Sequence, residues 1–431
     1  MKRRGFIIVT FISLVVISPW TTVLPLIYTT YAVLWKKVNL HKNYWNMGLF
    51  SLFVWSMIVG ILNRSTMSIL ASFAFLIYFC LSVFIQNYCT SESKVETVCK
   101  SLLQVSIFSA VLGIIEKIMY LTTGFELWKR VSELIGQPIF GDRINSTFGN
   151  PNVAGNWFAI MIIVSLYFTD KSKKSEKNFY SAVTVLFVIV LFLTGSRGAY
   201  IGVVCGLSMF LLLKKNKKDV LTIGLICLFT ATLIIIPTNL LDFNDTVGKQ
   251  VISPVDSENT VNNVEDNHEV DDSVNSRLGI WLGAMKMIED KPVAGWGLMA
   301  FLNPHTEYLG EYYYDTLYHA HNIWITFTAT LGSVGLIIYL YMKFNLFKDL
   351  RLLYQRNSRL TAMLAGIEVL ILGHGMVDFT MIAPQTGIMF IGCSAIISTL
   401  ALQCSRSSSK VPLFVKKYKS LTSGLTKNSR V

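Results

Sequence analysis

Long apolar segments recur along the whole chain, and they constrain its fold more than any other feature. They lie at residues 46–62, 66–87, 101–122, 151–169, 179–194, 198–213, 220–237, 322–342, 361–379 and 385–404. Most have the length of about 20 residues that a helix needs to cross a bilayer. Only 15% of the residues are charged, whereas about 25% is usual in soluble domains. The pattern predicts an all-α, polytopic transmembrane bundle.

The first apolar run, from Gly5 to Trp35, is longer than one span needs, and it contains Pro19 and Pro25 near its middle. It can form one kinked helix or a hairpin of two short helices. Charge placement favours the hairpin, because 28 Lys and Arg residues then lie on the side of the N-terminus and nine on the other. Basic residues concentrate in the cytoplasm, so this predicts about 12 spans with both termini cytoplasmic. The net charge of +12 is therefore a membrane feature, and we expect no nucleic-acid partner.

One long hydrophilic stretch divides the apolar segments into two groups. We expect an N-terminal bundle of about nine spans at 1–237, an extracytoplasmic loop at 238–318, a C-terminal bundle of three spans at 319–404 and a basic cytoplasmic tail at 405–431. This arrangement predicts that a single large loop lies outside the membrane.

The loop has two parts with different patterns. Residues 242–275 are acidic and have no steady period, which is typical of a mobile surface segment. From Ser276 onward the apolar residues follow helical spacing, and Pro292 follows the expected end of the helix. Either Asn275 or Ser276 can cap its N-terminus. The second part therefore predicts an amphipathic helix on the outer membrane surface.

Three arginines on the predicted outer side lie at the boundary of a span or helix. Arg143 precedes a span, Arg197 lies in the turn Thr-Gly-Ser-Arg-Gly (194–198), and Arg277 opens the amphipathic helix. A guanidinium matches two phosphate oxygens, and a helix N-terminus adds N–H donors. The arginines predict a site for a pyrophosphate-linked lipid. For each of them, the alternative is an interfacial anchor that reaches lipid phosphate.

Two histidines stand where the hydrophilic loop meets the next apolar run, in His319-Ala320-His321-Asn322. Histidine can take a proton near neutral pH, so His321 is our candidate general base for a sugar hydroxyl. The alternative is a boundary histidine bonded to lipid or backbone. The His-x-His pair also suggests a metal, but without a clear third ligand it makes a weak site, and we expect no metal.

His374 and Asp378 stand four residues apart near the outer end of a later predicted span. They could hydrogen-bond and face a cavity, or form a structural pair that stabilises that helix.

The spacing His-Asn-x9-Gly-x2-Gly (321–335) resembles the signature of the O-antigen ligase and Wzy-type polysaccharide polymerase superfamily. Further similar motifs follow the order of that superfamily: Thr-Phe-Gly-Asn-Pro-Asn (147–152), Thr-Gly-Ser-Arg-Gly (194–198), Ser-Arg-x3-Trp (276–281), Asp-Lys-Pro-x2-Gly-x-Gly (290–297) and His-Gly-x-Val-Asp-Phe (374–379). The resemblance covers about 140–385, and the first five spans match in hydropathy alone. It implies that Arg197 and Arg277 hold a lipid pyrophosphate while His321 activates the acceptor. The acidic stretch 242–275 departs from the pattern.

These observations predict an extracytoplasmic active site in the bacterial inner membrane, within an architecture that resembles type C glycosyltransferases. His321 would be catalytic, and Arg143 would join Arg197 and Arg277 at the donor pyrophosphate. The supporting residues would be His319, Asn322, His374 and Asp378. We expect a metal-independent polymerase that needs no cofactor and moves glycan from undecaprenyl pyrophosphate to a lipid-linked acceptor, making capsule, exopolysaccharide or O-antigen.

Two alternatives stay open. The first is an O-antigen ligase or protein O-oligosaccharyltransferase, which would use the same chemistry on another acceptor. The second is a transporter or flippase of lipid-linked glycan, but transporters gather polar groups near the bilayer midplane. The expected partners are the lipid-linked donor and acceptor and membrane lipids, with other polysaccharide-assembly proteins as further candidates.

Overall fold

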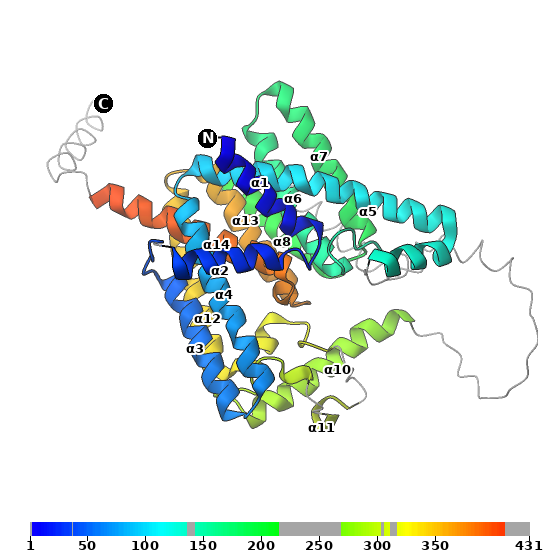
Figure 1. Cartoon of the computed structure of the whole chain (residues 1–431), viewed down its shortest axis with the longest axis vertical. Helices are drawn as coiled ribbons and strands as arrows, with labels where there is room; N and C mark the ends of the chain where they lie inside the picture. The colour runs from blue at the N-terminus through cyan, green and yellow to red at the C-terminus, as the bar shows by residue number, and fades with distance from the viewer. Residues whose placement is uncertain are drawn as a thin grey trace, which may run out of the picture.

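A computed structural model describes residues 2–36, 38–135, 143–214, 269–302, 306–310 and 317–409 of the chain. Within these ranges the secondary structure is entirely helical (Figure 1). The helices are α1 (Lys2–Ile17), α2 (Val23–Trp35), α3 (Tyr44–Leu62), α4 (Thr66–Tyr88), α5 (Glu92–Ile135), α6 (Pro151–Lys171), α7 (Lys174–Leu193), α8 (Arg197–Lys214), α10 (Glu269–Asp290), η3 (Ala300–Leu302), α11 (Thr306–Leu309), α12 (Ile323–Tyr354), α13 (Ser358–Gly375), η5 (Thr380–Ile382) and α14 (Pro384–Ser409).

Eight of the described helices are long and apolar enough to cross a membrane, which confirms the all-α transmembrane class. The span predicted at 220–237 and most of the acidic stretch 242–275 lie outside the described residues, as does the tail beyond residue 409. The count of 12 spans and the domain boundaries stay predictions.

The first apolar run forms two helices, α1 and α2, and not one kinked helix. The turn between them is closed by two hydroxyl groups: Thr21 donates to the carbonyl oxygen of Leu14 at 2.6 Å and Thr22 to that of Val15 at 3.1 Å. The predicted hairpin is therefore confirmed.

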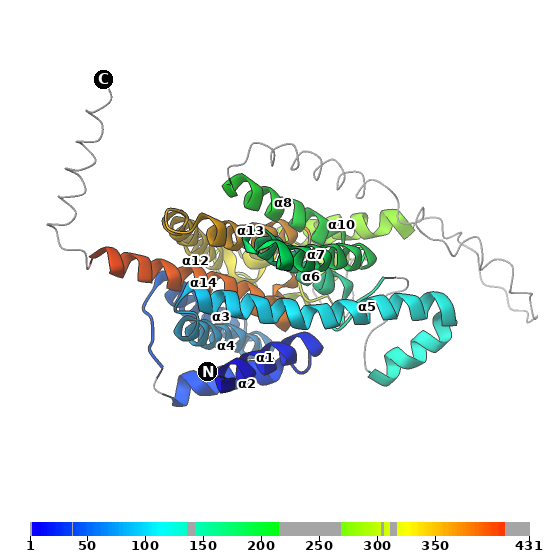
Figure 2. The same cartoon turned by 90° about the horizontal axis from the view of Figure 1, so that it is seen from above.

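Two helices form the centre of the bundle. In both α6 and α14, 83% of the residues in the apolar, membrane-length part of the helix are buried, whereas in α7 only 22% of them are. Seen from above, α6 lies among α5, α7, α8 and α13 (Figure 2). The start of α6 therefore lies close to the segment that precedes α14.

Helices α8 and α13 approach each other closely through glycines. A Cβ atom on Gly206 would lie 2.7 Å from the carbonyl oxygen of Gly366, and one on Gly202 would lie 3.0 Å from that of Leu370. Small residues let helix backbones come this near within a membrane. The contact places the first residues of α8 beside the last turn of α13.

Helix α12 extends beyond the predicted span 322–342. Lys343, the first residue after that span, is buried, and its ammonium group lies 2.7 Å from the Glu368 carboxylate. Ser394 donates to the other oxygen of Glu368 at 2.6 Å. Glu368, which lies within the predicted span 361–379, is thus half of a buried ion pair. Loss of either charge would leave the other uncompensated.

Gly332 breaks α12 into two helical segments. Its backbone has φ 64° and ψ −171°, a conformation that essentially only glycine adopts. The groups that the break frees have other partners: the carbonyls of Ala329, Thr330 and Leu331 accept from Trp296 N (2.9 Å), Gly297 N (2.7 Å) and Trp55 Nε1 (2.7 Å), and Ser333 N donates to Pro292 O (2.8 Å). The motif at 290–297 therefore packs onto the break that the glycine of the His-Asn motif creates.

Helix α10 confirms the amphipathic helix predicted in the loop, although it begins at Glu269 and not at the expected cap, Asn275 or Ser276. It buries Ile280 and Met287. The indole N–H of Trp281 donates to the Ala320 carbonyl at 2.7 Å. Figure 1 shows α10 at the end of the group formed by α3, α4 and α12. Its contact with the outer membrane surface stays a prediction.

Candidate active site

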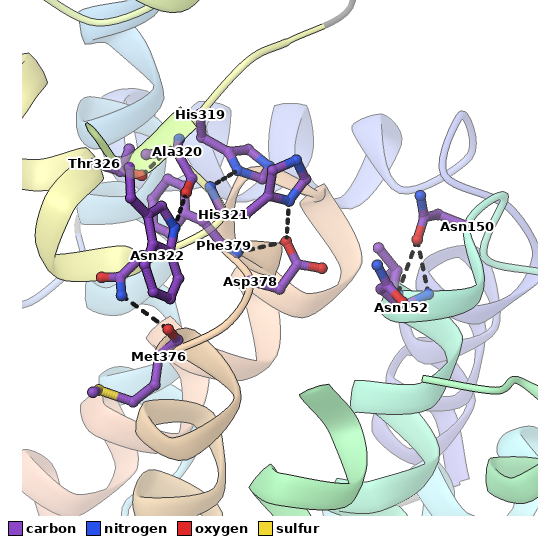
Figure 3. Close-up of polar contacts among 12 residues, drawn as sticks. Asn150, Asn152, His319, Ala320, His321, Asn322, Thr326, Met376, Asp378 and Phe379 are labelled. Carbon is purple, nitrogen blue, oxygen red and sulfur yellow. Dashed lines mark hydrogen bonds and ion pairs between the residues drawn. The ribbon is translucent and has the colours of Figure 1, made fainter. Parts of the chain in front are cut away.

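A cavity of about 550 Å³ lies where four connections between helices meet, and we call it the polar cavity because asparagine, histidine and aspartate side chains are part of its lining. Its lining includes the α1–α2 turn, the residues that open α6, the residues that precede α12 and the segment between α13 and α14. Asn150 and Asn152 line one side, and His319, His321 and Asp378 line the other (Figure 3). In the predicted topology all four connections lie on the outer side. His319 and His321 therefore line a cavity on the predicted outer side and do not stand alone at the membrane boundary.

His321 and Asp378 form a pair in this cavity. The His321 Nδ1 atom lies 3.1 Å from Asp378 Oδ1, which also accepts the backbone N–H of Phe379 at 2.7 Å. His321 has φ 50°, a left-handed conformation that is uncommon for residues other than glycine and often occurs at functional sites. Its backbone N–H donates to His319 Nδ1 at 3.1 Å. Both neighbours therefore fix the position of His321.

The electrostatics of the pair define its proton positions. Burial alone raises the pKa of Asp378, but the hydrogen bond from His321 and the charges of His374, His319 and His321 lower the pKa below its usual range. An ionised carboxylate only accepts hydrogen bonds, so the His321 Nδ1 atom must donate. The basic lone pair of a neutral His321 ring is then on Nε2.

His319 is held in its neutral form. Burial lowers its pKa to about 4; the Asp378 charge opposes this shift, while the positive charges of His321 and Arg277 add to it. A neutral ring can keep a lone pair on Nδ1, which is what the N–H of His321 requires. Protonation of His319 at Nδ1 would therefore remove the hydrogen bond that the backbone N–H of His321 donates to this atom.

Asn322 joins the pair to the scaffold. Its side-chain oxygen accepts the N–H groups of Trp324 at 2.9 Å and Ile325 at 3.2 Å, which caps α12. Its amide nitrogen donates to the Met376 carbonyl at 2.9 Å. One side chain therefore ties the start of α12 to the segment that carries Asp378.

The opposite side of the cavity is the N-terminus of α6. Asn150 caps this helix, with its oxygen 2.8 Å from the N–H of Asn152, and Pro151 occupies the first helical position. Arg143 donates to the Asn152 side-chain oxygen at 2.8 Å and to the Thr194 carbonyl at 2.9 Å. Its guanidinium thus connects the start of α6 with the turn that carries Arg197.

The remaining predicted residues lie around this core. Arg197 is the first residue of α8, and a Cβ atom on the adjacent Gly198 would lie 3.1 Å from His374 Nε2. The charge of Arg277 acts on both His319 and His374. His374 is buried at the end of α13, and the carboxylate beside it is bonded to His321. None of the three arginines is among the residues that line the polar cavity, and Arg143 contacts a lining residue, Asn152, at 2.8 Å.

Sequence reasoning missed two contributors. Glu116, a charged residue within the predicted span 101–122, accepts the backbone N–H groups of Asn145 at 3.2 Å and Ser146 at 2.7 Å. It thereby holds the loop that precedes α6. Asn150 was quoted only within a motif, yet an Asn-Pro pair directly before an apolar run is a signal for a helix start. That signal could have identified Asn150 as the cap of α6.

The geometry changes one argument about metals. The expected absence of metal rested on the lack of a third ligand, but the ligand atoms of His319, His321 and Asp378 lie within 4.8 Å of one another. Asp378 is therefore the third donor that the sequence did not reveal. Oxygen and imidazole donors of this kind suit a divalent ion such as zinc. Metal independence stays a prediction.

The low pKa of His319 gives a pH prediction. An unfolded histidine binds a proton below about pH 6.5, whereas folded His319 does so only below about 4. The free energy of unfolding should therefore decrease as the pH falls from about 6.5 to about 4. We expect the H319N variant, whose amide oxygen can still accept the His321 N–H, to show a smaller decrease in melting temperature in detergent. An unchanged pH slope would contradict this assignment, and H41N serves as the matched control.

Two comparisons with known proteins relate this region to a family. Residues 182–340, which include Arg197, Arg277 and His321, match the model of a family described as O-antigen ligase. The chain is also similar to the protein named "Putative polysaccharide ligase RC0486" of Rickettsia conorii, with 24% identity over 223 residues. That alignment covers 50% of this chain and 48% of the relative, so the chain spans about half the length of the curated relative it matches. Residues 182–340 of this chain are therefore similar to the O-antigen ligase family.

Proposed function

We propose that this protein is a glycan ligase that transfers a saccharide from a polyprenyl pyrophosphate to an acceptor hydroxyl at the outer face of the membrane. The family match and the name of the relative support a ligase better than the polymerase expected from sequence. The observation that carries an enzymatic function is the His321–Asp378 pair, 3.1 Å apart, in the lining of the polar cavity. A transporter would not need this pair.

His321 acts as the general base. Its Nε2 atom takes the proton of the acceptor hydroxyl as that oxygen forms a bond to the anomeric carbon of the donor. The bond between the anomeric carbon and the pyrophosphate oxygen breaks, and the lipid pyrophosphate leaves with the electron pair. Asp378 orients the ring and stabilises the imidazolium that forms, because its carboxylate already accepts from Nδ1.

The cations stabilise the leaving pyrophosphate. Arg143 lies against Asn152 at the start of α6, where the helix dipole also favours negative charge. Arg197 opens α8, and Arg277 is near enough to His319 to affect its charge. Arg143 and Asn150 form the donor side of the site, and the histidine side receives the acceptor. Arg197 and Arg277 add positive charge from positions nearer His374 and His319.

A reconstituted assay tests this function. Purified protein in proteoliposomes is given an undecaprenyl pyrophosphate-linked saccharide alone, or together with a lipid-core or protein acceptor. A ligase forms product only with the second acceptor, and it does so in the presence of EDTA. Extension of the donor without that acceptor would identify a polymerase instead. Movement of the saccharide across the bilayer without a new glycosidic bond would identify a transporter, and loss of activity in EDTA that zinc restores would overturn metal independence.

A further inference from the structure

Two imidazole rings and a carboxylate meet on one side of the polar cavity. The ring centroids of His319 and His321 lie 4.6 Å apart, with an angle of 72° between the ring planes. Asp378 comes from the segment between α13 and α14, and Asn322 ties that segment to the histidines. Three groups that can bind a metal ion are thus held together from two segments that are far apart in the sequence.

The donor atoms of these groups have nearly the spacing that a zinc ion requires. Zinc binds nitrogen and oxygen at about 2.0–2.2 Å, so two donors of a tetrahedral site lie about 3.4 Å apart. His321 Nδ1 and Asp378 Oδ1 already lie 3.1 Å apart, and the ligand atoms of His319, His321 and Asp378 all lie within 4.8 Å of one another. A shift of about 1.5 Å at one donor atom would complete the set, and the cavity has room for water as a fourth ligand.

The carboxylate of Asp378 offers a second oxygen atom to an ion. His321 and the backbone N–H of Phe379 both bond to Oδ1, and Figure 3 shows the other oxygen turned away from them. The Asp378 side chain is only 7% exposed. An ion at Oδ2 would therefore neutralise a buried negative charge without displacing the bond to Phe379.

The polar cavity is closed on its inner side. A second, apolar cavity of about 320 Å³ lies further along α6 and α14, at Trp157 and Ile388. Gln385 is buried between the two cavities and donates to the Val15 carbonyl at 3.0 Å and to the Thr147 carbonyl at 3.5 Å. An ion would therefore reach the histidines from the predicted outer side.

We propose that His319, His321 and Asp378 form a binding site for a divalent transition-metal ion such as zinc, and that an ion bound there stops glycan transfer. Imidazole donors suit zinc, whereas Mg²⁺ prefers an octahedral shell of oxygen atoms. The inhibition rests on the proposed function, because it takes His321 to be the general base. The binding of the ion does not depend on it.

Coordination removes the lone pair that the base needs. A neutral imidazole has one ring proton and one ring lone pair available to bind a proton or metal. If the ion binds Nδ1 of His321, the ring proton moves to Nε2, and if it binds Nε2, the lone pair there is used. In neither case can Nε2 take the proton of an acceptor hydroxyl. By the same reasoning, His319 exchanges the hydrogen bond from the His321 N–H for its bond to the ion.

Calorimetric titration of the purified protein in detergent, without any saccharide, tests the site. Wild type and H41A, which changes a histidine outside the cavity lining, should bind Zn²⁺ with equal affinity and should not bind Mg²⁺. H319N keeps an acceptor for the His321 N–H, and D378N keeps the shape of the carboxyl group, but each loses a zinc ligand. We expect the affinity for Zn²⁺ to fall at least about tenfold in both variants.

A charge variant guards against misfolding as an explanation. The positive charge of Arg277 acts on His319 and so opposes a cation at this site. R277Q should therefore bind Zn²⁺ more tightly than wild type, and misfolding does not produce a gain of affinity. Unchanged affinity in H319N, D378N and R277Q would place the ion elsewhere, for example at the cysteine thiols that line the apolar cavity, and would overturn the inference.

The transfer assay with added zinc tests the inhibition. Zn²⁺ should inhibit wild type and H41A, and EDTA should restore their activity. For the activity that H319N retains, the inhibitory concentration of Zn²⁺ should be at least about tenfold higher. An equal inhibitory concentration in H319N would mean that zinc acts on the donor pyrophosphate, which would overturn the inhibition. Full activity with zinc bound at the site would instead refute His321 as the base, while the metal site would stand.

Discussion

Replacing His321 with alanine is expected to decrease the rate of glycan transfer about 10²- to 10⁴-fold, the range that a general base contributes. The effect should be on kcat, because the pyrophosphate of the donor is assigned to the opposite side of the cavity. A single-turnover assay with saturating donor measures it. Cells that carry this variant should insert the protein normally and accumulate unprocessed lipid-linked glycan.

Controls distinguish catalysis from folding. H41A alters a histidine outside the lining of the polar cavity and should leave the rate unchanged. D378N keeps the shape of the carboxyl group but removes the charge that holds His321 Nδ1–H, so it should also decrease kcat. The double variant H321A/D378N should be little worse than H321A alone, because the two residues act as a unit. Normal transfer by H321A would remove His321 from the mechanism.

Substituting Gly332 with alanine is expected to lower the free energy of unfolding by about 2–6 kcal/mol, from backbone strain and overpacking together. The new Cβ atom would lie 2.0 Å from the carbonyl oxygen of Val293. Because that oxygen belongs to the backbone, the segment would have to move away from the break in α12. The hydrogen bonds from Trp296 and Gly297 to the freed carbonyls would then be lost. Thermal unfolding in detergent would measure the difference.

Gly310 offers a control for this prediction. It also has a positive φ, of 54°, but a Cβ atom there would meet nothing within 4 Å. G310A should therefore cost only the strain of a left-handed alanine, about 1–2 kcal/mol. If G332A and G310A lowered stability equally, the packing of the 290–297 segment onto the break would not matter for folding.

Much of the helical architecture could be predicted because its signal is local. Hydropathy and helical spacing act within one segment, so the hairpin of α1 and α2 and the amphipathic α10 were both visible in the sequence. Contacts between helices could not be predicted in this way. Lys343 illustrates this, since its partner Glu368 is on the next helix and hydropathy alone does not pair the two charges.

The candidate site was only partly visible. The residue types and boundary positions indicated His321 and the arginines, but not the geometry that joins them. His321 and Asp378 are 57 residues apart, whereas the sequence predicted a pair between Asp378 and His374, four residues before it. No spacing rule links residues on separate helices. The roles of Glu116 and Asn150 emerged for the same reason, from contacts made across the bundle.

The sequence by itself determined that this chain forms membrane-length helices and that its histidines and arginines stand at their boundaries. These properties follow from hydrophobicity and charge, which act on each segment separately. The tertiary structure decided that Asp378 hydrogen-bonds to His321, that the 290–297 segment packs onto the break at Gly332, and that an apolar cavity lies below the polar one. Each of these depends on how helices pack, because packing alone brings side chains distant in sequence within a few ångströms of one another.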